Sequence, residues 1–201
     1  MLSLDLERVS SRNIEAIAIG ASAGGIEALS VLLPVFPGDF AIPVFVVIHL
    51  PQDRPSLLVE LFTSKCALRV REPDDKQDVS AGIWFASPGY HLMIDSDRRF
   101  ALSVDEPVNY SRPSIDVLFQ TAAEVYGRGL LGIVLTGANN DGAAGAKAIA
   151  DNGGAIIVQD PDEAQAPTMP SAAISAVGSA IAAPLSRIAN LLQHLKVGVT
   201  P

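Results

Sequence analysis

The stretch Ile14–Gly25, I-E-A-I-A-I-G-A-S-A-G-G, joins an apolar run to a turn of small residues. The apolar residues 17–19 stop at Gly20, the hydroxyl of Ser22 follows, and a segment with helical apolar periodicity begins at Ile26. This order is typical of a buried strand, a tight turn and the first turn of a helix. The stretch therefore predicts a β-α unit.

Two functions fit a turn of this composition. A glycine-rich turn between strand and helix can bind a phosphate through its backbone N–H groups. Alternatively, the pattern G-x-S-x-G can present a nucleophilic serine. Gly20, Ser22 and Gly24 satisfy the serine pattern, whereas Ser22 occupies the place of the second glycine in the dinucleotide pattern G-x-G-x-x-G. No acidic residue closes the second predicted strand, which further disfavours a nucleotide site. The turn alone leaves both functions open.

Apolar strands alternate with helical segments on both sides of this turn. The pattern predicts main strands at 14–20, 43–50, 68–71, 130–135, 155–159 and 180–182. It predicts helices at 26–33, 56–66, 114–126, 142–151, 170–177 and 185–195. Such alternation is typical of parallel β-α-β units with right-handed crossovers. The predicted fold is therefore α/β, with three layers and a doubly wound, mainly parallel sheet.

The middle of the chain has a different pattern. Short strands are predicted at 83–86, 92–94 and 100–104, and tight turns separate them. Alternation with tight turns favours antiparallel hairpins over crossovers. We therefore expect an antiparallel hairpin insertion in the parallel sheet.

Composition limits the class of protein. The 201 residues carry a net charge of −8, which argues against nucleic-acid binding. No apolar run approaches the ~20 residues of a membrane span, so no direct membrane insertion is expected. One cysteine and no signal peptide favour a cytoplasmic protein. We expect one domain at 14–195, with a flexible N-terminal lead at 1–13 and a C-terminal tail at 196–201.

Polar side chains follow several predicted strands. Ser22 follows the first strand, His49 ends the second, Asp141 lies after 130–135, and Asp160 follows 155–159. The carboxyl ends of parallel strands share one edge of a sheet, where functional residues cluster. A serine hydrolase needs a hydroxyl activated by an imidazole that a carboxylate orients. Asp160 precedes proline and is typical of a turn, so Asp141 is the preferred acid.

Each member of this predicted triad also has a structural interpretation. Ser22 and Asp141 could each cap a helix, and His49 could be a buried histidine bonded to a backbone carbonyl. A shared sheet edge is required by the triad and is a coincidence if the three roles are separate. The shared edge therefore favours the catalytic interpretation.

The other candidates favour structural roles. His91 belongs to the hairpin region, and His194 lies in the last helix at the surface. Cys66 falls in an apolar helical pattern typical of a buried thiol. Three scattered histidines and one cysteine have no metal-ligand spacing, so no metal is expected. Arg112 stands at a helix start, where a cation is unfavourable, and a site role or a surface role remain open.

Six blocks in this order resemble the catalytic domain of the CheB-type chemotaxis protein-glutamate methylesterases. The blocks are GASAGG at 20–25, VIHLP at 47–51, SPGYH at 87–91, RPSIDVLF at 112–119, TGANNDGAAG at 136–145 and TMP at 168–170. The resemblance covers about 14–195. It implies a doubly wound parallel sheet with an antiparallel hairpin, and no metal or organic cofactor.

The resemblance also implies an activity. Such enzymes hydrolyse glutamate methyl esters on the cytoplasmic helices of chemoreceptors, release methanol, and in many cases deamidate glutamines at the same site. It makes Ser22 the nucleophile, His49 the general base and Asp141 the orienting acid. It places the oxyanion site or substrate pocket at five further residues: Ala23, Ala138, Asn139, Arg112 and Met169.

Three features depart from the family pattern. Ala23 replaces a threonine, Ala138 replaces a methionine associated with the oxyanion site, and Asn139 replaces a glycine. Only 13 residues precede the first strand, so the chain resembles a stand-alone branch that lacks the receiver domain. A separate receiver protein is then the expected regulator. The alternative function is a catalytically degenerate module that binds receptors or signalling proteins.

Overall fold

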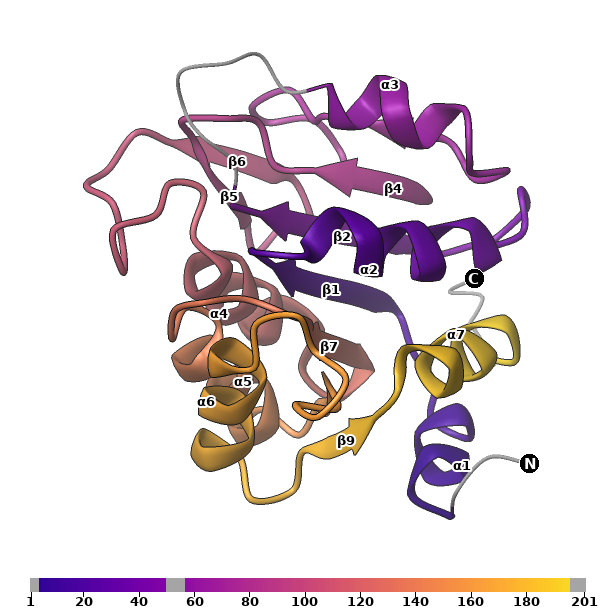
Figure 1. Cartoon of the computed structure of the whole chain (residues 1–201). Coiled ribbons are helices and arrows are strands. Elements are labelled where there is room, and N and C mark those ends of the chain that lie inside the picture. Colours follow the sequence, from indigo (N-terminus) through magenta and orange to yellow (C-terminus); the bar gives the residue numbers. More distant parts are fainter. Residues whose placement is uncertain (1–3, 50–56, 196–201) are drawn as a thin grey trace.

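Strand β1 (Ala16–Ala21) lies at the centre of a parallel sheet (Figure 1). The computed structural model describes residues 4–49 and 57–195, and in these residues the strand order is β3-β4-β2-β1-β7-β8-β9. The other strands are β2 (Pro43–Ile48), β3 (Val70–Arg71), β4 (Gly82–Phe85), β7 (Leu130–Val134), β8 (Ala155–Gln159) and β9 (Ile181–Ala183). The chain winds outward from β1 in both directions, which confirms the predicted doubly wound α/β fold.

Helices cover both faces of the sheet (Figure 1). One face carries α1 (Leu4–Ser10), α2 (Gly25–Leu32), η1 (Leu33–Val35), α3 (Leu58–Thr63) and α7 (Leu185–Gln193). The other carries α4 (Ile115–Tyr126), η2 (Gly127–Gly129), α5 (Ala143–Asp151) and α6 (Thr168–Ala176). Successive residues of β1 alternate between the two cores: Ile17 and Ile19 face α2, while Ala16 and Ala18 face α4. The small alanines leave room for α4 to pack closely on the sheet.

The predicted hairpin insertion is confirmed in part. β5 (His91–Ile94) and β6 (Phe100–Ser103) form an antiparallel pair that packs on the α4 side of the sheet. The prediction that 83–86 also belongs to the antiparallel region was wrong, because β4 pairs in parallel with β2 and β3. Ile83 lies in one core and Trp84 in the other, and burial on both faces is characteristic of a parallel strand.

The N-terminal segment differs from the predicted flexible lead. Residues 4–10 form α1, whose Leu6 and Val9 are buried beside α7. The C-terminal tail at 196–201 and the predicted element ends at Leu50 and Ser56 lie outside the described residues.

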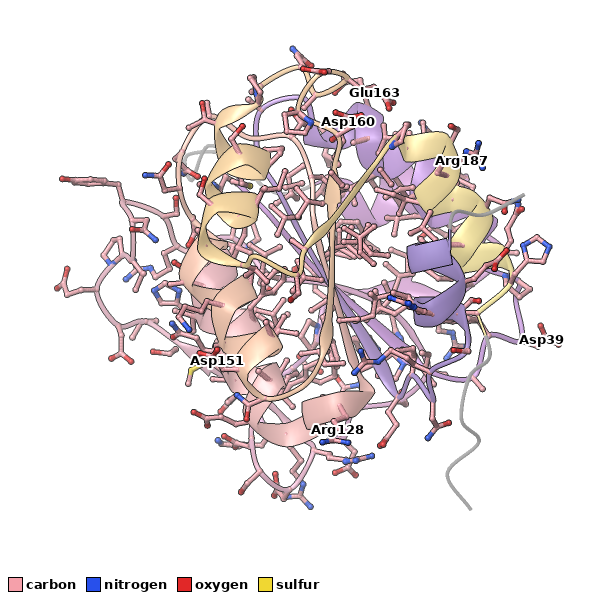
Figure 2. All side chains as sticks on the ribbon, turned by 90° about the horizontal axis from the view of Figure 1, so that it is seen from below. Asp39, Arg128, Asp151, Asp160, Glu163 and Arg187 are labelled. Atoms are coloured by element: carbon pink, nitrogen blue, oxygen red, sulfur yellow. The ribbon has the colours of Figure 1, made fainter. Side chains whose placement is uncertain are left out.

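Four of the charged side chains that Figure 2 labels, Asp39, Arg128, Asp151 and Arg187, are exposed at the surface. Within the residues that the structure describes, no helix has both the length and the apolar character needed to span a bilayer.

Candidate active site

The turn after β1 places Ser22 between the carboxyl ends of β2 and β7, the two strands that flank β1. The Ser22 N–H donates to the carbonyl of Thr136, at the end of β7, over 2.9 Å. Gly24 has a φ of 77° and forms the N-cap of α2, and a Cβ at this position would lie 2.5 Å from Gln165 Oε1. A glycine is therefore required to bend the chain from strand into helix here. The turn leaves the half-buried Ser22 at the carboxyl edge of the sheet.

Strand register brings His49 next to Ser22. Ala21 pairs with Ile48, and the His49 N–H donates to the Ala21 carbonyl over 3.1 Å. Ser22, which follows β1, and His49, which follows β2, are therefore direct neighbours. The strand order reverses between β1 and β7, whose carboxyl ends lie at the same edge, and such a reversal is the usual position of a binding crevice in open α/β sheets.

The imidazole of His49 is bonded to the carboxylate of Asp141. His49 Nε2 lies 2.8 Å from Asp141 Oδ2, and the side chains are 13% and 0% exposed. Since the carboxylate accepts, Nε2 carries the proton and Nδ1 presents its lone pair. The structure therefore brings together two of the three residues predicted from the strand ends.

Four further groups donate to the Asp141 carboxylate. They are the Ile115 N–H on Oδ2 (2.7 Å) and, on Oδ1, Ser114 Oγ (2.8 Å), the Asp116 N–H (3.1 Å) and Asn109 Nδ2 (3.2 Å). Two of these N–H groups belong to the first turn of α4, where unpaired donors and the helix dipole favour an anion. Asp141 thus caps α4 from a distant loop. The structural interpretation placed it on helix 142–151 instead, but the N-cap of α5 is Gly142.

Hydrogen bonding keeps Asp141 ionised despite its burial. Burial alone raises the pKa of this carboxyl, but donation from His49, Ile115, Ser114 and Asn109 outweighs it, and the pKa lies below its ordinary value. The site therefore presents a fixed negative charge to the imidazole.

The neighbouring carboxyl of Asp116 behaves in the opposite way. Burial, aided by the charge of Asp141, raises its pKa above the ordinary value, against donation from the Gly145 N–H over 2.6 Å. Asn109 Nδ2 donates to both carboxyls, at 2.9 Å to Asp116 and 3.2 Å to Asp141. Asn109 thus joins the two acids in one hydrogen-bonded unit.

The approach of α4 to the sheet depends on Gly20. A Cβ at Gly20 would collide with Cγ2 of Ile115, the first residue of α4. Without that Cβ, Ile115 packs against the end of β1 and its N–H reaches Asp141. The glycine that ends the apolar run of β1 therefore also allows the carboxylate to be held.

The Ser22 hydroxyl stands apart from this network. Within residues 4–49 and 57–195 it forms no hydrogen bond, so it is not bonded to His49 in this state. The Nδ1 atom of His49 instead faces Asn139, whose Nδ2 lies 3.4 Å away. Catalytic hydrogen bonds are often long or unmade before substrate binds, so this spacing is compatible with a serine nucleophile.

Two predicted pocket residues have open backbone donors. The N–H groups of Ala23 and Ala138 donate no hydrogen bond to the described part of the chain, and both residues are exposed. Thr136 Oγ1 donates to the Ala23 carbonyl over 2.8 Å and accepts the Ala166 N–H over 2.8 Å. This buried hydroxyl ties the serine turn to the loop after β7 and to the segment before α6.

The other two predicted pocket residues support loops. Met169 is fully buried, and its N–H donates to the Gly137 carbonyl over 2.9 Å, beneath the loop that carries Ala138. Arg112 Nη1 donates to the carbonyls of Val104 and Asp105 over 2.8 and 3.0 Å. The contacts described for Arg112 are therefore with the loop after β6.

Residues predicted to be structural have structural contacts. His91 accepts the Ser114 N–H at Nδ1 and donates to the Glu106 carbonyl from Nε2. Asp160 accepts the Asp162 N–H, as expected in a turn. Burial raises the pKa of the Cys66 thiol to about 11, which leaves it unreactive. Across the described ranges, no cluster of three or more His, Cys, Asp or Glu side chains could hold a metal ion.

Sequence reasoning missed three residues that shape the site. Ser114 and Asn109 bond to Asp141, and Thr136 joins the two loops. Ser114 is a serine directly before a helical pattern, which signals a cap, but its bond goes to a residue 27 positions away. That long-range partner has no local sequence signal.

The fold and the site define a class of protein. A parallel α/β sheet that presents a serine turn beside a histidine–aspartate pair, at the point where strand order reverses, has the arrangement of a serine hydrolase. Comparison with known proteins defines the family. The family model described as CheB methylesterase matches residues 17–192, and the chain belongs to this family.

Individual relatives match over most of the chain. A protein of Leptospira interrogans is 44% identical over 184 residues, which is 91% of this chain and 95% of that protein. The protein-glutamate methylesterase/protein-glutamine glutaminase of Archaeoglobus fulgidus is 37% identical over 90% of this chain and 53% of its own length. The crystal structure of the Thermotoga maritima CheB methylesterase catalytic domain superposes with a TM-score of 0.83, at 29% identity, over 90% of this chain and 98% of that domain.

Proposed function

We propose that this chain is a protein-glutamate methylesterase in which Ser22 is the nucleophile, His49 the general base and Asp141 the residue that orients His49. The observation that carries this proposal is the 2.8 Å bond between His49 Nε2 and a fully buried Asp141, beside the serine turn. This pairing sets the tautomer that leaves Nδ1 available to accept a proton.

The first half of the reaction forms an acyl-enzyme. Ser22 Oγ attacks the carbonyl carbon of the ester while its proton passes to His49 Nδ1, and the carbonyl π electrons become an oxyanion. The N–H groups of Ala23 and Ala138 stabilise that charge. The bond to the methoxy oxygen then breaks, and the proton on Nδ1 passes to this oxygen, which leaves as methanol.

The second half releases glutamate. A water molecule gives one proton to His49 Nδ1 and adds its hydroxide to the acyl carbon, and the second oxyanion uses the same N–H groups. When the bond to Ser22 breaks, the proton on Nδ1 returns to Oγ. The Asp141 carboxylate stabilises the imidazolium in both halves without taking a proton.

Methylated chemoreceptors are the proposed substrates. The relatives in Clostridium acetobutylicum and Archaeoglobus fulgidus are both named protein-glutamate methylesterase/protein-glutamine glutaminase. A glutamine side chain differs from the methyl ester only in its leaving group, so the same steps would release ammonia. We therefore include deamidation of receptor glutamines in the proposal. A separate receiver protein as regulator stays a prediction.

Methanol release tests the proposal. The wild-type chain should release methanol from a receptor fragment with glutamate methyl esters, and a serine-directed fluorophosphonate should label Ser22 in a one-to-one ratio. Ser22→Ala should lose both, whereas Ser175→Ala, which removes an exposed hydroxyl on α6, should retain both. Full turnover by Ser22→Ala would contradict the nucleophile assignment. Absence of labelling and of methanol from the wild type would favour the degenerate binding module.

A further inference from the structure

The side chain of Asn139 contacts Nδ1 of His49, the nitrogen that acts as the base in the proposed mechanism. Its side chain is half-buried in the loop after β7, and its Nδ2 lies 3.4 Å from His49 Nδ1. Nothing in the mechanism described above uses this contact. In the state described, the lone pair of Nδ1 therefore faces an amide and not the Ser22 hydroxyl.

The orientation of the Asn139 amide follows from a second contact. Its Oδ1 accepts the N–H of Asp141 over 3.1 Å, and a backbone N–H can only donate. The oxygen must therefore point toward Asp141, which leaves the NH₂ group pointing toward His49. Because Nε2 already donates to Asp141, Nδ1 is an acceptor, and the amide donates to it.

This contact opposes the first proton transfer. A donor on the lone pair of an imidazole stabilises the unprotonated ring. When Nδ1 takes the Ser22 proton, it becomes a donor that faces another donor, and the Asn139 amide must turn away. The amide also competes with the Ser22 hydroxyl for the single in-plane lone pair of Nδ1.

We propose that Asn139 is a positioning residue that restrains the base: its amide holds His49 as a neutral imidazole with Nδ1 occupied, and turnover requires this contact to break. The inference rests on the proposed function for its effect on rate. The contact itself is independent of any activity. The restraint lowers kcat and leaves substrate affinity nearly unchanged, because it acts on the proton transfer.

Asn139→Ser is the decisive variant. Its hydroxyl can accept the Asp141 N–H, two residues further on, as the Asn139 oxygen does, and it leaves no amide donor opposite Nδ1. Asn139→Ala removes both contacts, and Asn140→Ala is the matched control, since Asn140 is its exposed neighbour on the same loop. Removing one weak hydrogen bond to the base should raise kcat about three- to tenfold in both Asn139 variants. KM should stay constant, and Asn140→Ala should behave as the wild type.

A purely structural role predicts a different pattern. In that case Asn139→Ser, which keeps an acceptor for the loop contact, would match the wild type, and Asn139→Ala would be slower. Either result overturns the proposal. Methanol release from a glutamate methyl ester peptide gives kcat and KM, and Ser22→Ala run in parallel tests the proposed function separately.

A spectroscopic measurement needs no turnover. In ¹⁵N-labelled protein, the Nδ1 resonance of His49, assigned with a His49→Gln variant, should report an acceptor with a hydrogen bond in the wild type. It should move toward the position of an unbonded acceptor in Asn139→Ala and stay in place in Asn140→Ala. An unchanged Nδ1 resonance in Asn139→Ala would overturn the proposal even if the chain proved inactive.

Discussion

Ser114 shows how much of the site depends on single hydrogen bonds to Asp141. Its buried hydroxyl donates over 2.8 Å to a carboxylate that carries the charge of the site. Ser114→Ala should lower the free energy of unfolding by about 1.5–3 kcal/mol, the usual value for a bond to a charged group. Urea unfolding at neutral pH measures this loss. Ser175→Ala, which loses only an exposed bond within α6, should change stability by less than about 0.5 kcal/mol.

The charge of Asp141 predicts a pH dependence of stability. Its pKa is lower in the folded chain than the value of about 3.9 expected when unfolded, so the ionised form stabilises the fold above that pH. The contribution is lost as the pH falls through the folded-state pKa. Asp141→Asn should therefore destabilise the chain most near neutral pH, and the difference from the wild type should shrink below about pH 4. Denaturant unfolding over this pH range measures it, and a constant difference would contradict the assignment.

The sequence allowed site residues to be predicted only where they directly follow a strand. Ser22, His49 and Asp141 each follow a strand, so the parallel sheet alone places them at one edge. The carboxylate's other partners could not be predicted, because Ser114 and Asn109 reach Asp141 through tertiary packing of α4. The contact of Asn139 with His49 Nδ1 depends on side-chain orientation and was equally hidden.

The contact between the end of β1 and the first turn of α4 positions the Asp141 carboxylate. Gly20→Ala would put a methyl group into Cγ2 of Ile115 and push the first turn of α4 from the sheet edge. This overpacking should cost about 1–3 kcal/mol of stability and should lower esterase activity, because the Ile115 N–H moves from Asp141. Thermal unfolding and methanol release test both effects.

Gly178→Ala is the control for that variant. A Cβ at Gly178 meets nothing within 4 Å, so its stability and activity should stay near the wild-type values. Equal behaviour of the two glycine variants would contradict the role given to the close approach of Ile115.

Element prediction succeeded where a strand was long and apolar. The runs that became β1, β2, β7 and β8 were all placed, with ends shifted by a few residues. β4 was assigned to the wrong kind of pairing, because a four-residue strand does not reveal its partners. α1 was missed because its burial depends on contact with α7, at the other end of the chain.

At the scale of the whole molecule, one sheet separates two cores and should make them unfold together. The single tryptophan, Trp84, lies in the core beneath α4, whereas Leu191 of α7 lies in the opposite core. Leu191→Ala should cost about 2–5 kcal/mol. We expect the urea midpoint of unfolding of Leu191→Ala to fall by the same amount whether it is measured by tryptophan fluorescence or by far-UV circular dichroism. Separate transitions would show that the two faces unfold independently.

The overall architecture was the most predictable feature of the chain. Alternating strands and helices leave few topologies once crossovers are right-handed, and the doubly wound sheet followed from that rule. The rule orders strands but does not describe the fit of side chains between them. The substrate pocket around Ala23 and Ala138 depends on that fit, so its shape did not follow from the pattern.

The double role of Asp141 has a consequence for the history of such proteins. Its carboxylate caps α4 as well as holding His49, whereas the Ser22 hydroxyl bonds to nothing in the described part of the chain. A lineage that no longer needed the reaction could lose Ser22 without destabilising its fold. Loss of Asp141 would remove the cap of α4 and destabilise the fold. Inactive descendants should therefore retain the aspartate after they have lost the serine. A retained aspartate is thus weak evidence of activity in a distant homologue.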